Sequence, residues 1–137
     1  MPDSAAVDAA VFAVLNDPTL KGLLPDGVYR DVAPQSKTKV AVVLTPTHSD
    51  TDQFQDTAYE TFSYLVKAVT KDNSVITANN AAARIDQLMR ALPSPAGYVL
   101  MIARRRERVA YSEPDPSNPD LFWQHRGGLY DVMVSPA

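Results

Sequence analysis

The sequence predicts an α+β domain: a largely antiparallel sheet of four to five strands, with two main helices packed on one face and a long C-terminal hairpin. Three observations favour this class. Helical periodicity occurs near the N-terminus and again over 77–92, several long segments have the composition of strands, and the last two such segments follow one another directly. The length of 137 residues fits a single domain over 1–137 with one core.

The first predicted helix covers residues 4–16. Its apolar positions recur at i, i+4, i+7 and i+8 and make one stripe, formed by Val7, Val11, Val14 and Leu15. Asp3 or Ser4 is a candidate N-cap, and the residues before Pro18 end the helix. A short helical turn is expected over 19–24, followed by a turn at 25–27.

Two strands and a polar loop are predicted next. A short strand over 28–33 is closed by Pro34, and a strand over 39–45, apolar on both faces, belongs in the middle of the sheet and ends at Pro46. Residues 46–58 are expected to form an acidic loop without Lys or Arg, which contains His48, Asp50, Asp52 and Asp56. A long strand over 59–70 follows.

The second predicted helix covers 77–92, with Thr77 as N-cap. Its buried stripe is formed by Ala78, Ala81, Ala82, Ile85, Leu88, Met89 and Leu92. The C-terminal strands are expected over 98–112 and 121–134. The proline-rich segment 113–120 should be the loop between them, because proline cannot donate to a sheet ladder.

Composition excludes several classes of protein. The net charge of −3 argues against a protein that mainly grips nucleic acid, and the absence of cysteine excludes disulfides and thiolate metal sites. No apolar stretch approaches the roughly 18 residues of a membrane span, and the first residues lack the basic region of a signal peptide. A soluble protein made in the cytoplasm, without cofactor or membrane contact, is therefore expected.

No catalytic or metal-binding set is recognisable, so an enzyme is not expected. There is no nucleophile elbow, and the acidic segment with Asp50, Asp52 and Asp56 lacks the glycine and glutamate of a calcium loop. His125 shares a strand face with Trp123 and Leu129 and is expected to be half-buried and hydrogen-bonded. The pair Gly127–Gly128 indicates a bulge or a close backbone contact inside a strand.

Four arginines in the penultimate strand are the strongest local irregularity. Alternation would put Arg104, Arg106 and Arg108 on one face with Leu100 and Ile102, and Arg105 on the other. The strand is therefore expected to leave the core as a hairpin arm. That arm is either solvated or in contact with an acidic partner, and the nearby acidic residues weaken a third alternative, nucleic acid. Phe122 and Trp123 on the partner strand also need cover.

The chain resembles the tail terminator, or tail completion, proteins of long-tailed phages. The matching features are the order and spacing of the elements across nearly the whole chain, above all segments 7–15, 24–29, 32–35, 39–45, 83–92, 111–115 and 126–132. The acidic loop before a long strand matches as well. The run of arginines at 104–106 is not a feature that we associate with the family.

The resemblance implies a structural virion protein at the neck, assembled in the host cytoplasm. It would form a hexameric ring that caps the tail tube, ends tube polymerisation and offers a surface for head–tail joining. Its partners would be further copies of itself, the tail tube protein and a head-closure or connector protein, with the genome DNA passing through the lumen unbound. Candidate interface residues are Asp50, Asp52, Asp56, Arg104, Arg105, Arg106, Arg108, Phe122 and Trp123. A head-closure protein, an assembly chaperone and a small hydrolase or ligand-binding domain remain the alternatives.

Overall fold

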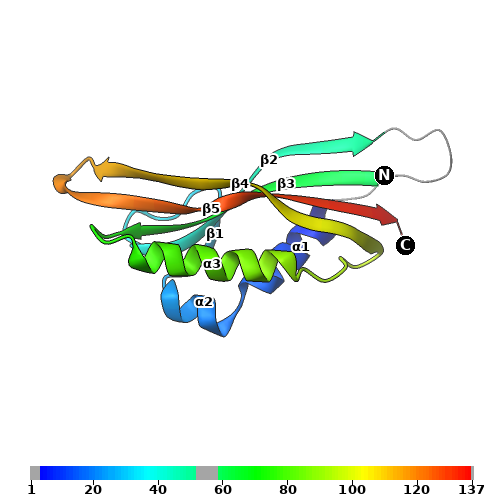
Figure 1. Cartoon of the computed structure of the whole chain (residues 1–137), viewed down its shortest axis with the longest axis horizontal. Helices are drawn as coiled ribbons and strands as arrows, with labels where there is room; N and C mark the ends of the chain where they lie inside the picture. The colour runs from blue at the N-terminus through cyan, green and yellow to red at the C-terminus, as the bar shows by residue number, and fades with distance from the viewer. Residues whose placement is uncertain (1–3, 52–58, 137) are drawn as a thin grey trace.

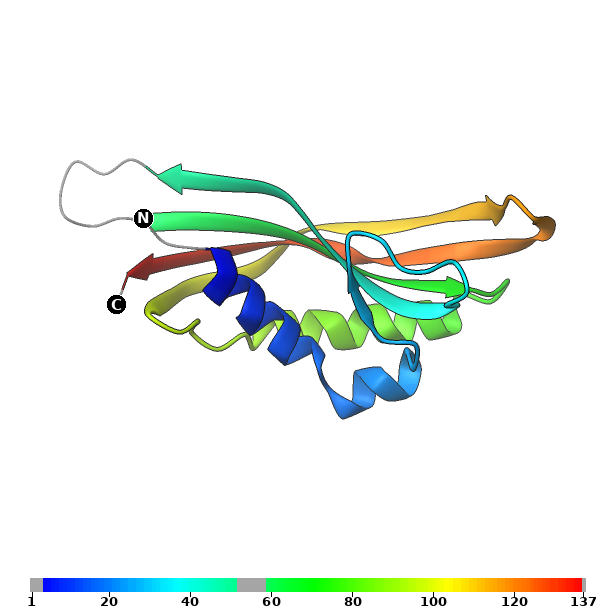
Figure 2. The same ribbon diagram turned by 180° about the vertical axis from the view of Figure 1, so that it is seen from behind.

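The computed structural model describes residues 4–51 and 59–136 as one sheet with helices on one of its faces (Figures 1 and 2). The helices are α1 (Ser4–Leu15), α2 (Pro18–Leu23) and α3 (Ile76–Arg90). The strands are β1 (Val28–Arg30), β2 (Lys39–Thr51), β3 (Tyr59–Lys71), β4 (Tyr98–Asp115) and β5 (Asn118–Pro136). The predicted α+β class, helix positions and C-terminal hairpin are confirmed.

The five strands lie in the order β1-β2-β3-β5-β4. β1 is parallel to β2, whereas the other neighbours are antiparallel. β4 is an edge strand, so one side of its 18 residues has no neighbouring strand within the described sheet. The helices leave the opposite face of the sheet, here called the outer face, uncovered by helix (Figure 2).

The main core lies between the helices and the inner face of β3 and β5. Ile85 and Met89 of α3 are fully buried and belong to the same cluster as Phe62, Tyr64 and Tyr130 of the sheet. Leu92 joins the same cluster. Helix α3 therefore packs on β3 and β5 through this cluster.

Truncating Ile85 to alanine should lower the free energy of unfolding by about 2–5 kcal/mol, because the side chain is fully buried and its removal leaves a cavity. Chemical denaturation measures this. Asn80→Ala, at an exposed position of the same helix, is the control and should change stability by less than about 0.5 kcal/mol. Equal stabilities of the two variants would show that this helix face is not packed.

Two buried tyrosines tie the helices to the sheet. The Tyr64 hydroxyl donates to Asp8 of α1, and the Tyr130 hydroxyl donates to Asp86 of α3 at 3.0 Å. Burial, reinforced by the neighbouring carboxylate, raises the pKa of both tyrosines. Arg105 reaches the same Asp86 carboxylate from β4 at 3.7 Å, so α3 is anchored to two strands.

Strand β2 is longer than predicted. It continues through Pro46 to Thr51, with an irregularity between Leu44 and Thr47. β1 pairs only as far as Val43 of β2, so beyond that point β2 has an open side where a proline needs no partner. β1 itself ends three residues early, because Asp31 takes a left-handed φ of 63°.

The predicted loop 113–120 is also wrong. The strands of the hairpin run to Asp115 and resume at Asn118, with Pro116 and Ser117 in the turn. Pro114 is tolerated because β4 is an edge strand. The Asp115 carboxylate accepts from the Ser117 backbone N–H at 3.0 Å and closes the turn. Thr77 likewise lies inside α3, whose N-cap is Val75 without a side-chain cap.

Candidate functional site: an outer-face groove and an arginine-bearing edge

A groove of about 540 Å³ opens on the outer face near the hairpin turn. Its floor is apolar, since Val40, Val42 and Val69 form a buried cluster there with Trp123 packed against it. One wall is the segment 31–37 and the other is the end of the hairpin. Its charged lining residues are Asp31, Lys37, Lys67, Lys71, Glu113 and Asp115.

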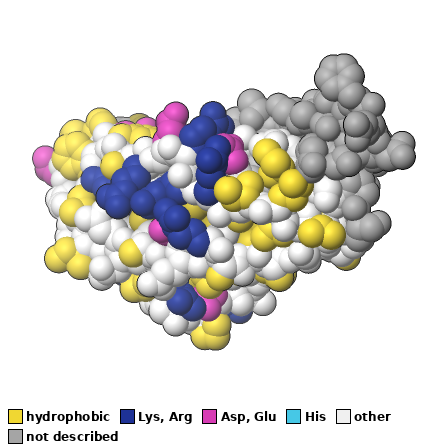
Figure 3. Space-filling view, turned by 45° about the vertical axis from the view of Figure 1, so that its right-hand side comes forward, with side chains coloured by type: hydrophobic (Ala, Val, Ile, Leu, Met, Phe, Trp, Pro, Cys, Tyr) yellow, Lys and Arg dark blue, Asp and Glu magenta, His cyan; other side chains and the backbone are white. Residues whose placement is uncertain are grey.

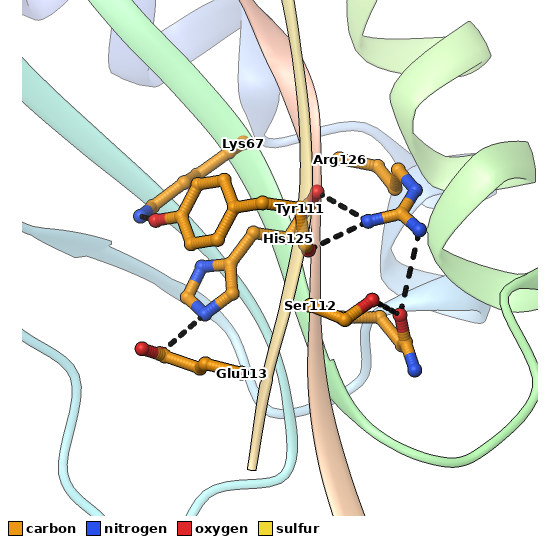
Figure 4. Close-up of polar contacts among 7 residues, drawn as sticks. Lys67, Tyr111, Ser112, Glu113, His125 and Arg126 are labelled. Carbon is orange, nitrogen blue, oxygen red and sulfur yellow. Dashed lines mark hydrogen bonds and ion pairs between the residues drawn. The ribbon is translucent and has the colours of Figure 1, made fainter.

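His125 is a buried polar group of this groove, 6% exposed like Asp115. Its ring stacks on Tyr111 with centroids 4.3 Å apart. Nε2 lies 2.7 Å from the Glu113 carboxylate, and the Lys67 ammonium donates to the Tyr111 hydroxyl at 2.7 Å. Figure 4 shows these four side chains on one side of the hairpin and Ser112 and Arg126 on the other.

The surroundings of His125 favour its neutral form. Burial lowers the pKa of the imidazole first, the Lys67 ammonium lowers it further, and the Glu113 carboxylate opposes both. Nδ1 is buried and has no hydrogen-bond partner among the described residues. A protonated ring would therefore carry a buried, unpaired N–H.

The free energy of unfolding should fall as the pH drops below about 6.5, the ordinary histidine value. The imidazole has a lower pKa in the folded than in the unfolded state, so unfolding takes up a proton and acid favours it. The stabilisation by neutral His125 is fully present above that pH, and it is lost as the pH falls through the pKa of the folded state. NMR titration of the ring protons should give a midpoint below 6.5. His125→Asn should flatten the fall in melting temperature, and a midpoint above 6.5 would contradict this account.

The groove does not assemble a nucleophile and a base. Within the described residues, no serine or threonine hydroxyl bonds His125, and the Ser112 hydroxyl is engaged with Gln124 on the other side of the hairpin. No group of three His, Asp or Glu side chains that could hold a metal occurs in the described ranges 4–51 and 59–136. What the groove offers is an apolar floor with a charged rim. No pattern in the sequence predicted this pocket.

The arginines of β4 are distributed differently from the prediction. Cross-strand partners share a face, and irregularities at Leu100/Ile102 and Arg105/Glu107 reset the alternation. Arg104 is opposite Asp131 on the outer face, whereas Arg105 and Arg108 are opposite Tyr130 and Gly128 on the helix-covered face. Arg106, the extra residue of the second bulge, turns to the outer face.

Two of the four arginines are neutralised within the chain. Arg106 lies 3.2 Å from the Asp131 carboxylate and donates to Ser63, and Arg105 pairs with Asp86. The predicted arm that leaves the core is therefore wrong for these two residues. Arg104 and Arg108 are exposed and have no charged partner in the part of the chain that the structure describes. Figure 3 shows Lys and Arg side chains gathered in one patch with hydrophobic side chains beside it.

Gly127 and Gly128 mark the close backbone contact that the sequence predicted. A Cβ on Gly127 would lie 2.1 Å from the Val66 carbonyl oxygen, and one on Gly128 would lie 2.6 Å from the Arg105 side chain. β3 and β5 stay in register there, so Gly127 does not form a bulge in that pair. The glycines let β3 approach β5 and let the Arg105 stem cross the inner face.

The remaining predicted site residues do not form one cluster. Asp50 and His48 lie in β2 rather than in a loop, and Asp52 and Asp56 lie outside the described residues. Phe122 is 37% exposed, and Trp123 packs on the outer-face cluster with the Lys71 ammonium 5.6 Å from its ring. Of the candidates whose side chains the structure describes, Trp123 is thus the one that lines the groove.

No helix among the described residues is long and apolar enough to cross a membrane. No family model matches the sequence, and no curated protein matches it. Solved structures do match. A chain of the "virion of native gene transfer agent (GTA) particle" is 18% identical with a TM-score of 0.67, over 97% of this chain and 99% of the other.

A second solved structure, described only by a sequence identifier, is 16% identical with a TM-score of 0.58, over 100% of this chain and 97% of its own. At these identities the likeness establishes a shared fold. The matches extend over nearly the full length of both neighbours and of this chain, so helices and hairpin both take part in them.

Proposed function

We propose that the protein is a structural component of a phage-like virion: a tail terminator that forms a six-membered ring on the end of the tail tube. The observation that carries this proposal is the fold match to a chain of a gene transfer agent virion, over 97% of this chain and 99% of that one. The order of elements that resembles tail terminators supports it. The ring ends tube polymerisation and offers a surface for head–tail joining.

The surfaces of the chain suit such a role. A closed ring needs two different, complementary surfaces on every subunit. The chain has an open groove on its outer face and an edge strand with two exposed arginines that have no charged partner among the described residues. No hydroxyl nucleophile stands beside His125 in the described part, which favours a structural over an enzymatic role.

The contacts of the ring are part of the proposal. Arg108 reaches an acidic surface of the neighbouring subunit, for which Asp50, Asp52 and Asp56 are the candidates by composition. The flat ends of the ring meet the tail tube protein and a head-closure or connector protein. The DNA passes through the lumen without specific binding, in line with the net charge of −3, and no cofactor takes part.

Deletion of the gene followed by electron microscopy of the lysate tests the function. We expect DNA-filled capsids and separate tails of uncontrolled length, because nothing stops tube growth. Expression of the wild-type chain in trans is the control and should restore joined particles. Tails of normal length already joined to heads would refute the proposal. Headless tails of normal length would indicate a head-closure protein instead.

A further inference from the structure

We infer that the outer-face groove receives the apolar start of β4 from a second copy of the chain. That strip, here called the β4 strip, consists of Val99, Met101 and Ile102. The inference rests on the proposed ring and names one of its contacts. It assigns the groove to one subunit and the strip to the next, in a head-to-tail arrangement.

The groove is open in the isolated chain although its floor is apolar. Val40, Val42 and Val69 form that floor, and Val32 is 79% exposed at the rim. Removing such a side chain from water is favourable in proportion to the apolar area that is buried. An apolar partner in the groove would cover Val32 as well as the floor.

The β4 strip supplies apolar side chains that its own chain leaves uncovered. Val99, Met101 and Ile102 are 49%, 47% and 41% exposed. Val99 and Ile102 face the outer side with Ser135 and Met133, and Met101 is the extra residue of a bulge between Leu100 and Ile102. Bulges often re-aim side chains at a strand edge, and adjacent exposed apolar residues mark contact sites.

Carboxylates on the groove walls can pair with an arginine beside the β4 strip, although Lys37, Lys67 and Lys71 also line the groove. Arg104 follows the β4 strip on the outer face and has no charged partner within the described residues. The walls of the groove carry Asp31 and Glu113, and the Glu113 side chain is 55% exposed despite its bond to His125. A strip lying in the groove places the neighbour's guanidinium near these carboxylates, where it gains charge-assisted hydrogen bonds.

The placement of the two surfaces favours a ring over a closed pair. The groove lies near the hairpin turn and the β4 strip lies at the opposite end of the sheet (Figure 1). The sheet twists between these ends, so the outer face turns from one end to the other (Figure 2). When the groove of one subunit binds the β4 strip of the next, each subunit still has one free groove or strip. Such head-to-tail contacts repeat around an axis instead of closing after two subunits.

Engineered disulfides test the contact cleanly because the chain has no cysteine. A double variant, Val32→Cys with Ile102→Cys, should give a ladder of covalent oligomers when its assembled rings are oxidised. Each single variant alone should stay uncrosslinked, and a mixture of the two singles should give dimers only. The double variant should exceed the single variants in crosslinked fraction by at least about tenfold, since the contact raises the effective concentration of the thiols.

A second pair of variants separates contact from folding. Ile102→Glu should abolish rings in negative-stain images and keep the wild-type melting temperature. Ile76→Glu is the matched control, because Ile76 is 67% exposed on α3 and lies away from the outer face; its rings should persist.

Rings of the wild type, together with no ladder and intact rings of Ile102→Glu, would overturn the inference and leave the proposed function standing. Dimers of Val32→Cys alone would overturn it in favour of a groove-to-groove pair. The deletion phenotype decides the proposed function independently of either result.

Discussion

Gly127→Ala should destabilise the protein by about 3 kcal/mol or more, at the upper end of the cost of overpacking a core. The added Cβ would lie 2.1 Å from the Val66 carbonyl oxygen and 2.5 Å from the Lys67 Cα. Both atoms belong to the backbone of β3, so relief requires β3 and β5 to separate in the middle of the sheet. Denaturant unfolding, or loss of soluble protein on expression, measures the effect.

Two other glycines provide graded controls for this prediction. At Gly128 the nearest atoms are in the flexible Arg105 stem, so alanine there should cost less than at Gly127. Gly22 of α2 has no atom within 4 Å of the added Cβ, and alanine should stabilise that helix by roughly 0.5–1 kcal/mol. A Gly127→Ala variant as stable as Gly22→Ala would mean that β3 and β5 do not approach so closely.

Combined reversal of Arg104 and Arg108 to glutamate should abolish ring assembly and leave the monomer folded. An exposed ion pair contributes at most about 1 kcal/mol, which is hard to detect in a single contact. In a closed ring of six subunits the same substitution recurs at every contact, so its effect on the whole assembly is multiplied accordingly. Size-exclusion chromatography with light scattering would record the shift from ring to monomer.

The choice of these two arginines follows from the structure. Arg105 and Arg106 hold Asp86 and Asp131 of their own chain, so reversing them would confuse folding with assembly. Lys21→Glu on α2, which makes half of this change in net charge, is the control for charge reversal elsewhere on the surface and should leave rings intact. Rings at wild-type yield from the double variant would show that these side chains are only solvated.

The sequence predicted the sheet and helices well because their apolar periodicity is local. The stripe of α3 and the apolar residues of β2 on both faces follow from positions a few residues apart. The structure buries them as expected, except Ala82 and Leu44, which are half-buried. The errors occur where an element's neighbours decide its limits. Pro46 and Pro114 lie inside strands because each strand has an open side there, which no local pattern reveals.

The groove could not be predicted for a similar reason. Its walls come from the segment 31–37 and from the hairpin turn, which are distant in sequence. The prediction of which sheet face each arginine occupies was wrong because two bulges in β4 reset the alternation of side chains. No glycine or proline marks these bulges in the sequence. The unusual density of charge around Arg104–Arg108 was the one available signal, and it did indicate an irregular strand.

The irregularities of β4 also bear on how such a protein survives at high concentration before it assembles. A regular open edge of 18 residues would be a template for pairing with the strands of other chains and for aggregation. Two bulges within the strand, a proline near its end and the long charged side chains between them interrupt that template. The same strand can therefore offer side chains to a neighbour, while its irregular backbone discourages uncontrolled edge-to-edge pairing with strands of other chains.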